Sequence, residues 1–154
     1  MAPLPGLLLG LVLGLAAAPA LAAPETGERP GVDPELLRHE SEIMAGFSEA
    51  DADRVARLLS PRLKTYVACH PLAREDGYYG ADQLRLLLRR LFRGRETTGF
   101  KVVTQVSPRQ DGQAVLQAIW SYRDAVSPTA QLHLAFTLAR EAGAWRLREI
   151  RDLS

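Results

Sequence analysis

The spacing of the apolar residues changes near Gly99, and this change constrains the fold more than any other feature of the chain. Before Gly99, apolar residues recur mostly every three or four positions, which is the period of an amphipathic helix. After Gly99 they alternate with polar residues, which is the period of a strand with one buried face. The sequence therefore predicts an α+β domain in which the helices come first and a sheet comes last.

Two helices are expected at the start of this domain. Asp33 and Pro34 supply an N-cap and a first-turn proline for the first helix, whose apolar face includes one charged residue, Glu40. Ser48 or Asp51 can begin a second, shorter helix, because either side chain can accept a hydrogen bond from the first turn. We leave the choice between these two caps open.

A third helix is predicted over residues 81–93, because it carries leucines in one arc and Gly94 follows its end. Three arginines lie four residues apart on another arc: Arg85, Arg89 and Arg93. Such a stripe is either a solvated helix face or a docking surface for an anionic partner. Because no aromatic residues interleave it, nucleic acid is the least suitable partner.

Period-two alternation predicts the strands. Residues 63–68 form a short strand, and residues 69–79 are expected to be a loop. Four longer strands are predicted over residues 100–106, 113–124, 131–140 and 144–153. Turn residues separate them, so they are expected to form an antiparallel meander.

The first part of the chain has the pattern of an export signal. Residues 1–23 are apolar, carry no charged side chain and end in small residues, so cleavage is expected after Ala22 or Ala23. The same run has about the twenty residues that a membrane span requires, so an uncleaved anchor is the competing interpretation. Residues 24–31 are interpreted as a flexible tether and residues 32–154 as one domain, secreted or periplasmic and free of the membrane after cleavage.

Charge and cysteine content limit the partners and the chemistry. The chain has 19 basic and 18 acidic residues, a formal net charge of +1, which gives no reason to expect nucleic acid as a partner. Cys69 is the only cysteine, so no internal disulfide can form, and its thiol is expected to be either buried or available to an outside thiol. Its neighbour His70 would point to the opposite side of an extended segment, which is unsuitable for a nucleophile and base. The histidines are scattered, so neither a metal site nor a cofactor is expected.

The order helix, helix, strand, helix and four long strands resembles the cystatin-like, nuclear transport factor two-like (SnoaL-like) cone fold. Tyr78 and Tyr79 before the leucine-rich helix, and the final run 143–150 (GAWRLREI), are similar to a secreted bacterial family of this fold whose function is unassigned. The resemblance implies three helices and a short strand packed on a curved four-stranded antiparallel sheet. It also implies a pocket at the open end of the cone and a homodimer through the exposed sheet face.

The resemblance directs attention to side chains that could line such a pocket. The ligand-binding candidates are four aromatic residues and one histidine: Tyr66, Tyr79, Trp120, Tyr122 and His133. Tyr78 and Tyr79 are expected to serve mainly as packing at the cone rim. The sequence leaves open which face of strand 113–124 looks into the cone.

Enzymes of this fold, such as ketosteroid isomerase, move a proton beside a carbonyl, so titratable groups were sought as proton carriers. The candidates are Glu40, Asp124 and His133. Asp124 could instead cap a turn or pair with an arginine, and His133 could be a hydrogen-bonded surface residue. His39 is expected to face solvent.

Two functional hypotheses follow. The first is a non-catalytic secreted or periplasmic domain that binds a small molecule or a protein partner through the cone pocket or the arginine-bearing helix. The alternative is a small general acid–base lyase or isomerase of the ketosteroid isomerase or dehydratase type. No motif specifies a reaction, and the first hypothesis is preferred for that reason.

Overall fold

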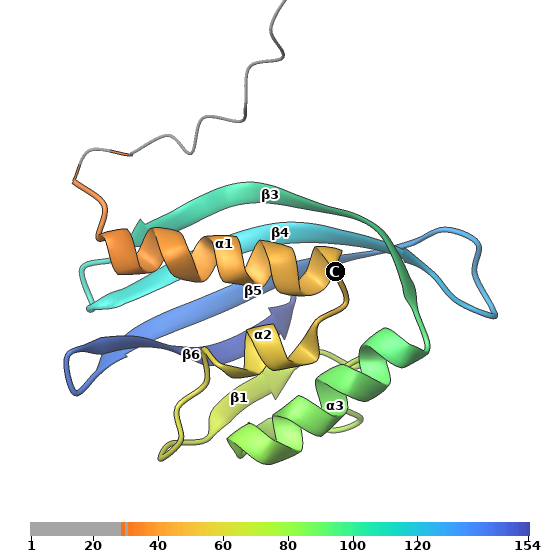
Figure 1. The fold of residues 1–154 in the computed structure, drawn as a ribbon, viewed down its shortest axis with the longest axis horizontal. Helices are drawn as coiled ribbons and strands as arrows, with labels where there is room; N and C mark the ends of the chain where they lie inside the picture. Colours follow the sequence, from red (N-terminus) through yellow and green to blue (C-terminus); the bar gives the residue numbers. More distant parts are fainter. Residues whose placement is uncertain (1–28, 30) are drawn as a thin grey trace, which may run out of the picture.

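The computed structural model describes Arg29 and residues 31–154, and its helices cover one face of a single curved sheet (Figure 1). The predicted signal segment 1–23 lies outside the described residues, as does most of the predicted tether. The elements are, in chain order, α1 (Pro34–Ser48), α2 (Ala52–Ala56), β1 (Thr65–Ala68), β2 (Gly77–Tyr79), α3 (Ala81–Arg93), β3 (Glu96–Pro108), β4 (Gln113–Arg123), β5 (Ala130–Glu141) and β6 (Ala144–Asp152). Among the described residues, no helix is long and apolar enough to cross a membrane.

The sheet has the strand order β2-β1-β6-β5-β4-β3. Its last four strands form the predicted antiparallel meander. Two further strands extend it, because β1 pairs parallel with β6 and β2 pairs antiparallel with β1. The expectation of a loop over residues 69–79 was therefore wrong at its end, where three residues form β2. So short a strand gives too few positions for a period to be recognised.

The helix ends follow from local chemistry. The Asp33 side chain accepts a hydrogen bond from the backbone N–H of Glu35 at 2.9 Å, and Asp51 accepts one from Arg54 at 3.0 Å. Asp51, rather than Ser48, is thus the N-cap of α2. The bounds predicted for α3, residues 81–93, are confirmed.

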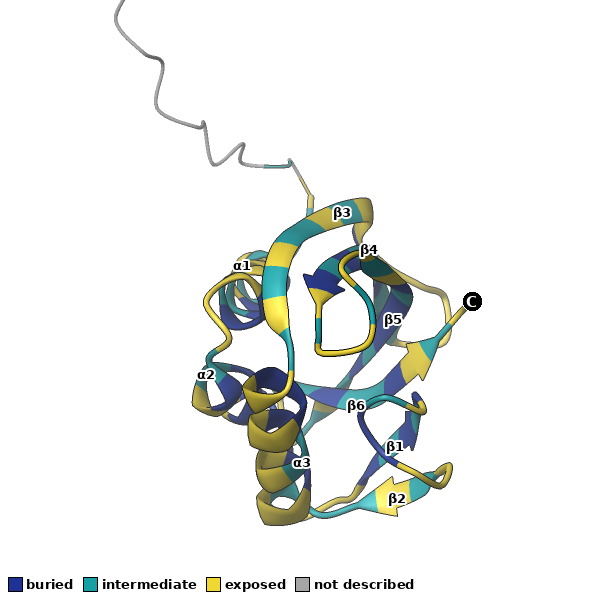
Figure 2. Cartoon of the chain, turned by 90° about the vertical axis from the view of Figure 1, so that its right-hand side faces the viewer, coloured by how far each residue is buried: buried dark blue, intermediate teal, exposed yellow. Residues whose placement is uncertain are grey.

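The inner face of β4 is the face that carries Trp120. Leu116, Ala118 and Trp120 are fully buried, and Tyr122 is nearly so. In Figure 2 the buried segments lie where the helices meet the sheet, and the outward faces of the helices are exposed. The choice that the sequence left open is thereby resolved: this face looks into the cone.

A cluster of aromatic rings fills the space between α1 and the sheet. The ring of Phe47 on α1 lies 5.2 Å from those of Phe92 and Phe100, and 5.5 Å from those of Trp120 and Phe136, measured between centroids. Edge-to-face and tilted pairs at these separations are attractive beyond their burial of area. Phe47 therefore joins α1 to α3, β3, β4 and β5.

Gly46 permits the close packing of α1 against α2. A Cβ atom at this position would lie 2.5 Å from Cγ2 of Val55, which is shorter than any relaxed carbon–carbon contact. Here, the absence of a side chain is a requirement of tertiary packing rather than of backbone conformation.

We expect Gly46→Ala to lower the free energy of unfolding by about 1–3 kcal/mol, because the added methyl overpacks a closed contact. Urea denaturation measures this change. The double variant Gly46→Ala/Val55→Ala should lose less than the sum of the two single changes, because it removes the clash. Gly77→Ala is the matched control, since nothing lies within 4 Å of its added Cβ. Strict additivity of the two changes would contradict this account.

Candidate functional site

A hollow of about 630 Å³ lies at one end of the cone, between residues 48–50, residues 93–97 and the end of β4. We call it the mouth. It is formed where the C-terminal ends of α1 and α3 approach the start of β3. Three chain segments distant in sequence therefore meet there.

Ion pairs and turn hydrogen bonds engage most charged groups of the mouth. Arg123 donates to both carboxylate oxygens of Glu96, at 2.7 and 2.6 Å. Hydrogen bonds from the backbone N–H groups of Ser127 and Val126 hold the pKa of the Asp124 carboxyl below its usual value. Asp124 thus caps a turn, which is the second of the two roles considered for it.

Two arginines of the mouth are less fully engaged. Arg95 reaches Asp124 only at 4.0 Å and lies over the Tyr122 ring, 5.3 Å from its centroid. Its Nε is buried and has no hydrogen-bond partner among the described residues. Arg93 forms no ion pair within the described part of the chain, so Arg93 and Arg95 keep free donors in a mouth whose lining carries three arginines and three carboxylates.

The five ligand-binding candidates do not come together. Trp120 is a core residue, whose Nε1 donates to Thr97 Oγ1 at 2.9 Å, and Tyr122 packs on it with ring centroids 4.4 Å apart. Only Tyr122 lies near the mouth, beneath Arg95. Tyr66, Tyr79 and His133 lie away from the mouth.

Tyr66 and His133 lie on the outer face of the sheet. Val67 and Leu134, their chain neighbours, point into the core and are almost fully buried, so the alternation of a strand turns Tyr66 and His133 outward. Tyr79 precedes α3, and its hydroxyl donates to the carbonyl of Glu75 at 2.6 Å.

The three proton-carrier candidates are also separated. Glu40 on α1 accepts hydrogen bonds from the backbone N–H of Val106 at 2.7 Å and from Arg29 at 2.8 Å. The Glu40 carboxylate therefore has a structural role at the edge strand β3. Asp124 caps a turn, and His133 lies on the sheet face opposite to α1. The arrangement lacks the convergence that general acid–base catalysis requires.

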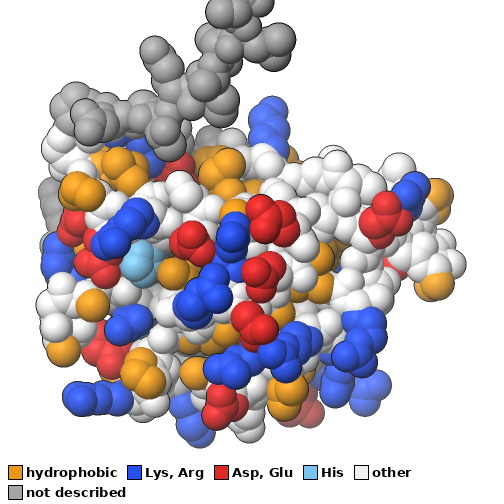
Figure 3. All heavy atoms as spheres, in the orientation of Figure 1, with side chains coloured by type: hydrophobic (Ala, Val, Ile, Leu, Met, Phe, Trp, Pro, Cys, Tyr) orange, Lys and Arg blue, Asp and Glu red, His pale blue; other side chains and the backbone are white. Residues whose placement is uncertain are grey.

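The arginine stripe of α3 is partly neutralised by α2. Arg89 donates to both carboxylate oxygens of Asp53 at 2.8 and 2.9 Å, and Arg85 approaches Asp53 at 3.8 Å. No local sequence pattern indicates this pairing, because it depends on how α2 packs on α3. Figure 3 shows acidic and basic side chains interleaved over the helical face, with basic side chains gathered towards the C-terminal end of α3.

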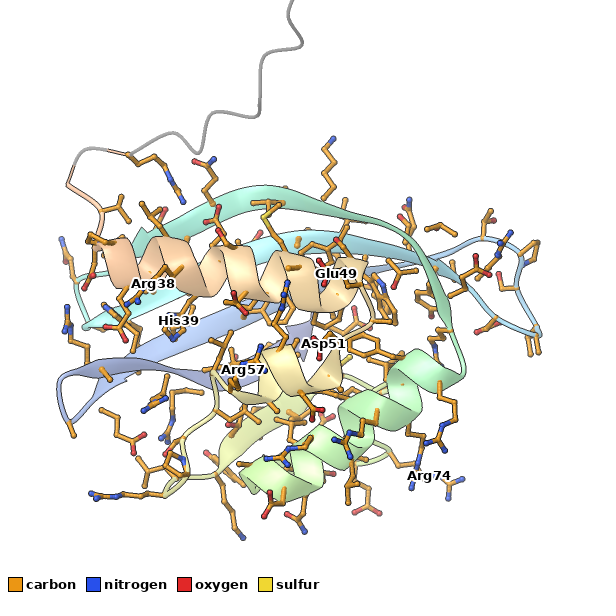
Figure 4. The ribbon with its side chains drawn as sticks, viewed as in Figure 1. Arg38, His39, Glu49, Asp51, Arg57 and Arg74 are labelled. Atoms are coloured by element: carbon orange, nitrogen blue, oxygen red, sulfur yellow. The ribbon has the colours of Figure 1, made fainter. Side chains whose placement is uncertain are left out.

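The expectation that His39 faces solvent was wrong. His39 is buried, and its Nδ1 and Nε2 lie 2.8 and 3.0 Å from the carbonyl oxygens of Glu35 and Trp145. Figure 4 shows this side chain between α1 and the strands beneath it. The start of β6 covers this turn of α1, a contact between residues more than one hundred positions apart that helical spacing cannot reveal.

Cys69 is buried, which is the first of the two states that the sequence left open. Loss of hydration raises the pKa of its thiol to about 11. A thiol in this state is a poor nucleophile at neutral pH. Among the described residues, no group of three or more histidine, cysteine or acidic side chains is placed to hold a metal ion.

Comparisons with known proteins were informative at the level of structure. No protein-family model matches this sequence, and no curated protein matches it significantly. A DUF4783 family protein from Bacteroides ovatus superposes with a TM-score of 0.57 at 9% identity, over 73% of this chain and 91% of that one. AusH from Aspergillus nidulans gives a TM-score of 0.59 at 12% identity, over 80% and 85% of the two chains.

A third similar structure is a hypothetical protein with a ketosteroid isomerase-like fold from Catenulispora acidiphila, in complex with trimethylamine. It gives a TM-score of 0.58 at 12% identity, over 80% of this chain and 87% of that one. Identities this low establish the fold alone. The chain has the nuclear transport factor two-like cone fold, as its order of elements predicted.

We expect the free energy of unfolding to fall as the pH rises from about 9 to about 11, because the unfolded thiol of Cys69 ionises in this range while the folded thiol stays neutral. The loss is at most about 2.7 kcal/mol for two pKa units. Urea denaturation across this range measures it. Cys69→Ala should remove this part of the decline, and identical pH profiles for the two proteins would contradict the assignment.

Proposed function

We propose that this chain is a non-catalytic secreted or periplasmic domain that binds a small molecule or a protein partner at the mouth, beside the arginine face of α3. The observation that carries the proposal is the contrast between the aromatic packing inside the cone and the open hollow at its end. Space for a partner is available at the mouth, whereas Phe47 and Trp120 occupy the interior.

The charges at the mouth favour an anionic group on the partner. Glu96 is bound by Arg123, and Glu49 lies 3.3 Å from Arg54 of α2. Arg93 and Arg95 therefore keep guanidinium N–H groups that can donate to a ligand. A carboxylate or phosphate between them would accept charge-assisted hydrogen bonds, which are stronger than neutral ones.

Export and self-association are parts of the same proposal. The apolar run 1–23 supports export. A homodimer would form through the outer sheet face beside β3, where Val103 is half exposed. Sedimentation velocity measurements determine the oligomeric state.

A general acid–base lyase or isomerase remains the alternative function. A ketosteroid isomerase-like fold in one similar structure supports it. The separation of Glu40, Asp124 and His133 supports the binding function instead.

The mouth can be tested by titrating isotope-labelled protein with succinate and with inorganic phosphate. We expect saturable shifts of the backbone amides of residues 93–97. The double variant Arg93→Gln/Arg95→Gln should bind at least about tenfold more weakly, since one charge-assisted hydrogen bond is worth 1.5–3 kcal/mol. Arg90→Gln, an exposed change on the same helix, is the matched control. Equal shifts in all three proteins, or no saturation, would contradict the proposal.

The alternative function has its own test. Proton transfer beside a carbonyl exchanges hydrogen for deuterium when ketones are incubated in heavy water. We expect the protein to leave the exchange rate of a ketone panel at the buffer value. Exchange that Glu40→Gln, Asp124→Asn or His133→Gln abolishes would establish the enzyme and displace the binding proposal.

A further inference from the structure

A second hollow, of about 470 Å³, lies on the outer face of the sheet. We call it the outer groove. It shares no lining residue with the mouth, so it is a site separate from the one proposed above. Leu63, Tyr66, Tyr78, Arg109, Thr137 and Arg148 are among its lining residues. Figure 2 places the helices on one side of the sheet, which leaves the strands uncovered on the other.

Strand register explains how these residues meet. Tyr78 on β2 is paired with Tyr66 on β1, and Tyr66 is paired with Glu149 on β6. The same row continues to Thr137 on β5 and Val115 on β4. Four spacings between strands span about 19 Å, so the groove runs across the strands over the length of a small molecule.

One end of the groove is aromatic and apolar. The rings of Tyr66 and Tyr78 meet edge to face, with centroids 5.2 Å apart. Tyr78 is 67% exposed and Leu63 is 48% exposed. The Arg151 guanidinium lies over the Tyr66 ring, 5.3 Å from its centroid, so the exposed ring of Tyr78 beside Leu63 is the platform on which a flat apolar group can stack.

The other end is basic. Arg109 forms no ion pair among the described residues, and Arg148 forms one ion pair, with Glu141 at 3.6 Å. The one carboxylate of the groove, Glu149, is already bound by Arg151 at 2.7 Å. Arg140, which also lines the groove, is held by Asp33. Unpaired positive charge in the groove therefore comes from Arg109, and Arg148 lies beside it with its charge partly neutralised by Glu141.

We propose that the outer groove binds an amphipathic anion, a small molecule with a flat aromatic or apolar ring at one end and a carboxylate or phosphate at the other. The ring stacks on Tyr78, and the anionic group lies between Arg109 and Arg148. The arrangement matches the usual composition of small-molecule sites, in which apolar contact supplies affinity and a few polar groups set orientation. The volume lies within the range of about 300–1,000 Å³ typical of such sites.

The probe for this site is 2-naphthoate, and its neutral analogue 2-naphthamide separates charge from stacking. We expect naphthoate to shift the backbone amides around Tyr66, Tyr78 and Arg148, and to bind at least about tenfold more tightly than the amide, the ratio for about 1.4 kcal/mol. Isotope-edited nuclear magnetic resonance locates the shifts, and calorimetry measures the affinities.

Three variants separate the contribution of the charged contact to affinity from the contribution of ring stacking. Arg109→Gln should remove most of the preference for the carboxylate and leave naphthamide binding unchanged. Tyr78→Ala should weaken both ligands. Arg90→Gln, on α3 and outside the groove, should change neither, and thermal denaturation checks that all three variants are folded.

Three results would overturn the proposal. Equal affinities for naphthoate and naphthamide would show that the outer groove does not recognise the anionic group. Shifts confined to residues 93–97 would assign the ligand to the mouth instead. A homodimer that buries Tyr78 and excludes naphthoate would assign the outer groove to self-association.

Discussion

The structure depends on the insertion of Phe47 among the aromatic rings of the sheet. Its contacts with Phe100, Trp120 and Phe136 join the last turn of α1 to three strands of the meander. The sheet must curve around α1 for these rings to meet from several sides. The cone is therefore a consequence of packing large side chains at native density, with Gly46 allowing α2 to approach closely enough to close the remaining side.

This packing determines where binding can occur. Because bulky rings occupy the interior, the candidate sites lie at the mouth and on the outer sheet face, and both combine tyrosine with arginine. Two charged side chains at the edge of the sheet also stabilise the fold. Glu40 and Arg29 engage the backbone N–H and carbonyl of Val106 on the edge strand β3, which blocks that part of the edge from pairing with another chain.

Much of the fold could be predicted because local signals were strong. The cap at Asp33, the bounds of α3 and the meander all follow from side chains within a few positions of each element. The candidate site was harder to predict. Tyr66 and Tyr122 were predicted to line one pocket, but Tyr66 lies at the outer groove and Tyr122 lies beneath Arg95 near the mouth. Arg109 was not selected, since an arginine beside a turn gives no sign of its distant neighbours.

By itself, the sequence determined the class of the fold and the order of its helices and longer strands, because hydrophobic period and capping are properties of short segments. Only the tertiary structure decided which face of β4 points inward, that His39 is covered by β6, and which arginines retain free donors. These outcomes depend on contacts between residues far apart in the chain. Curvature and strand register create such contacts, and no local pattern records either of them.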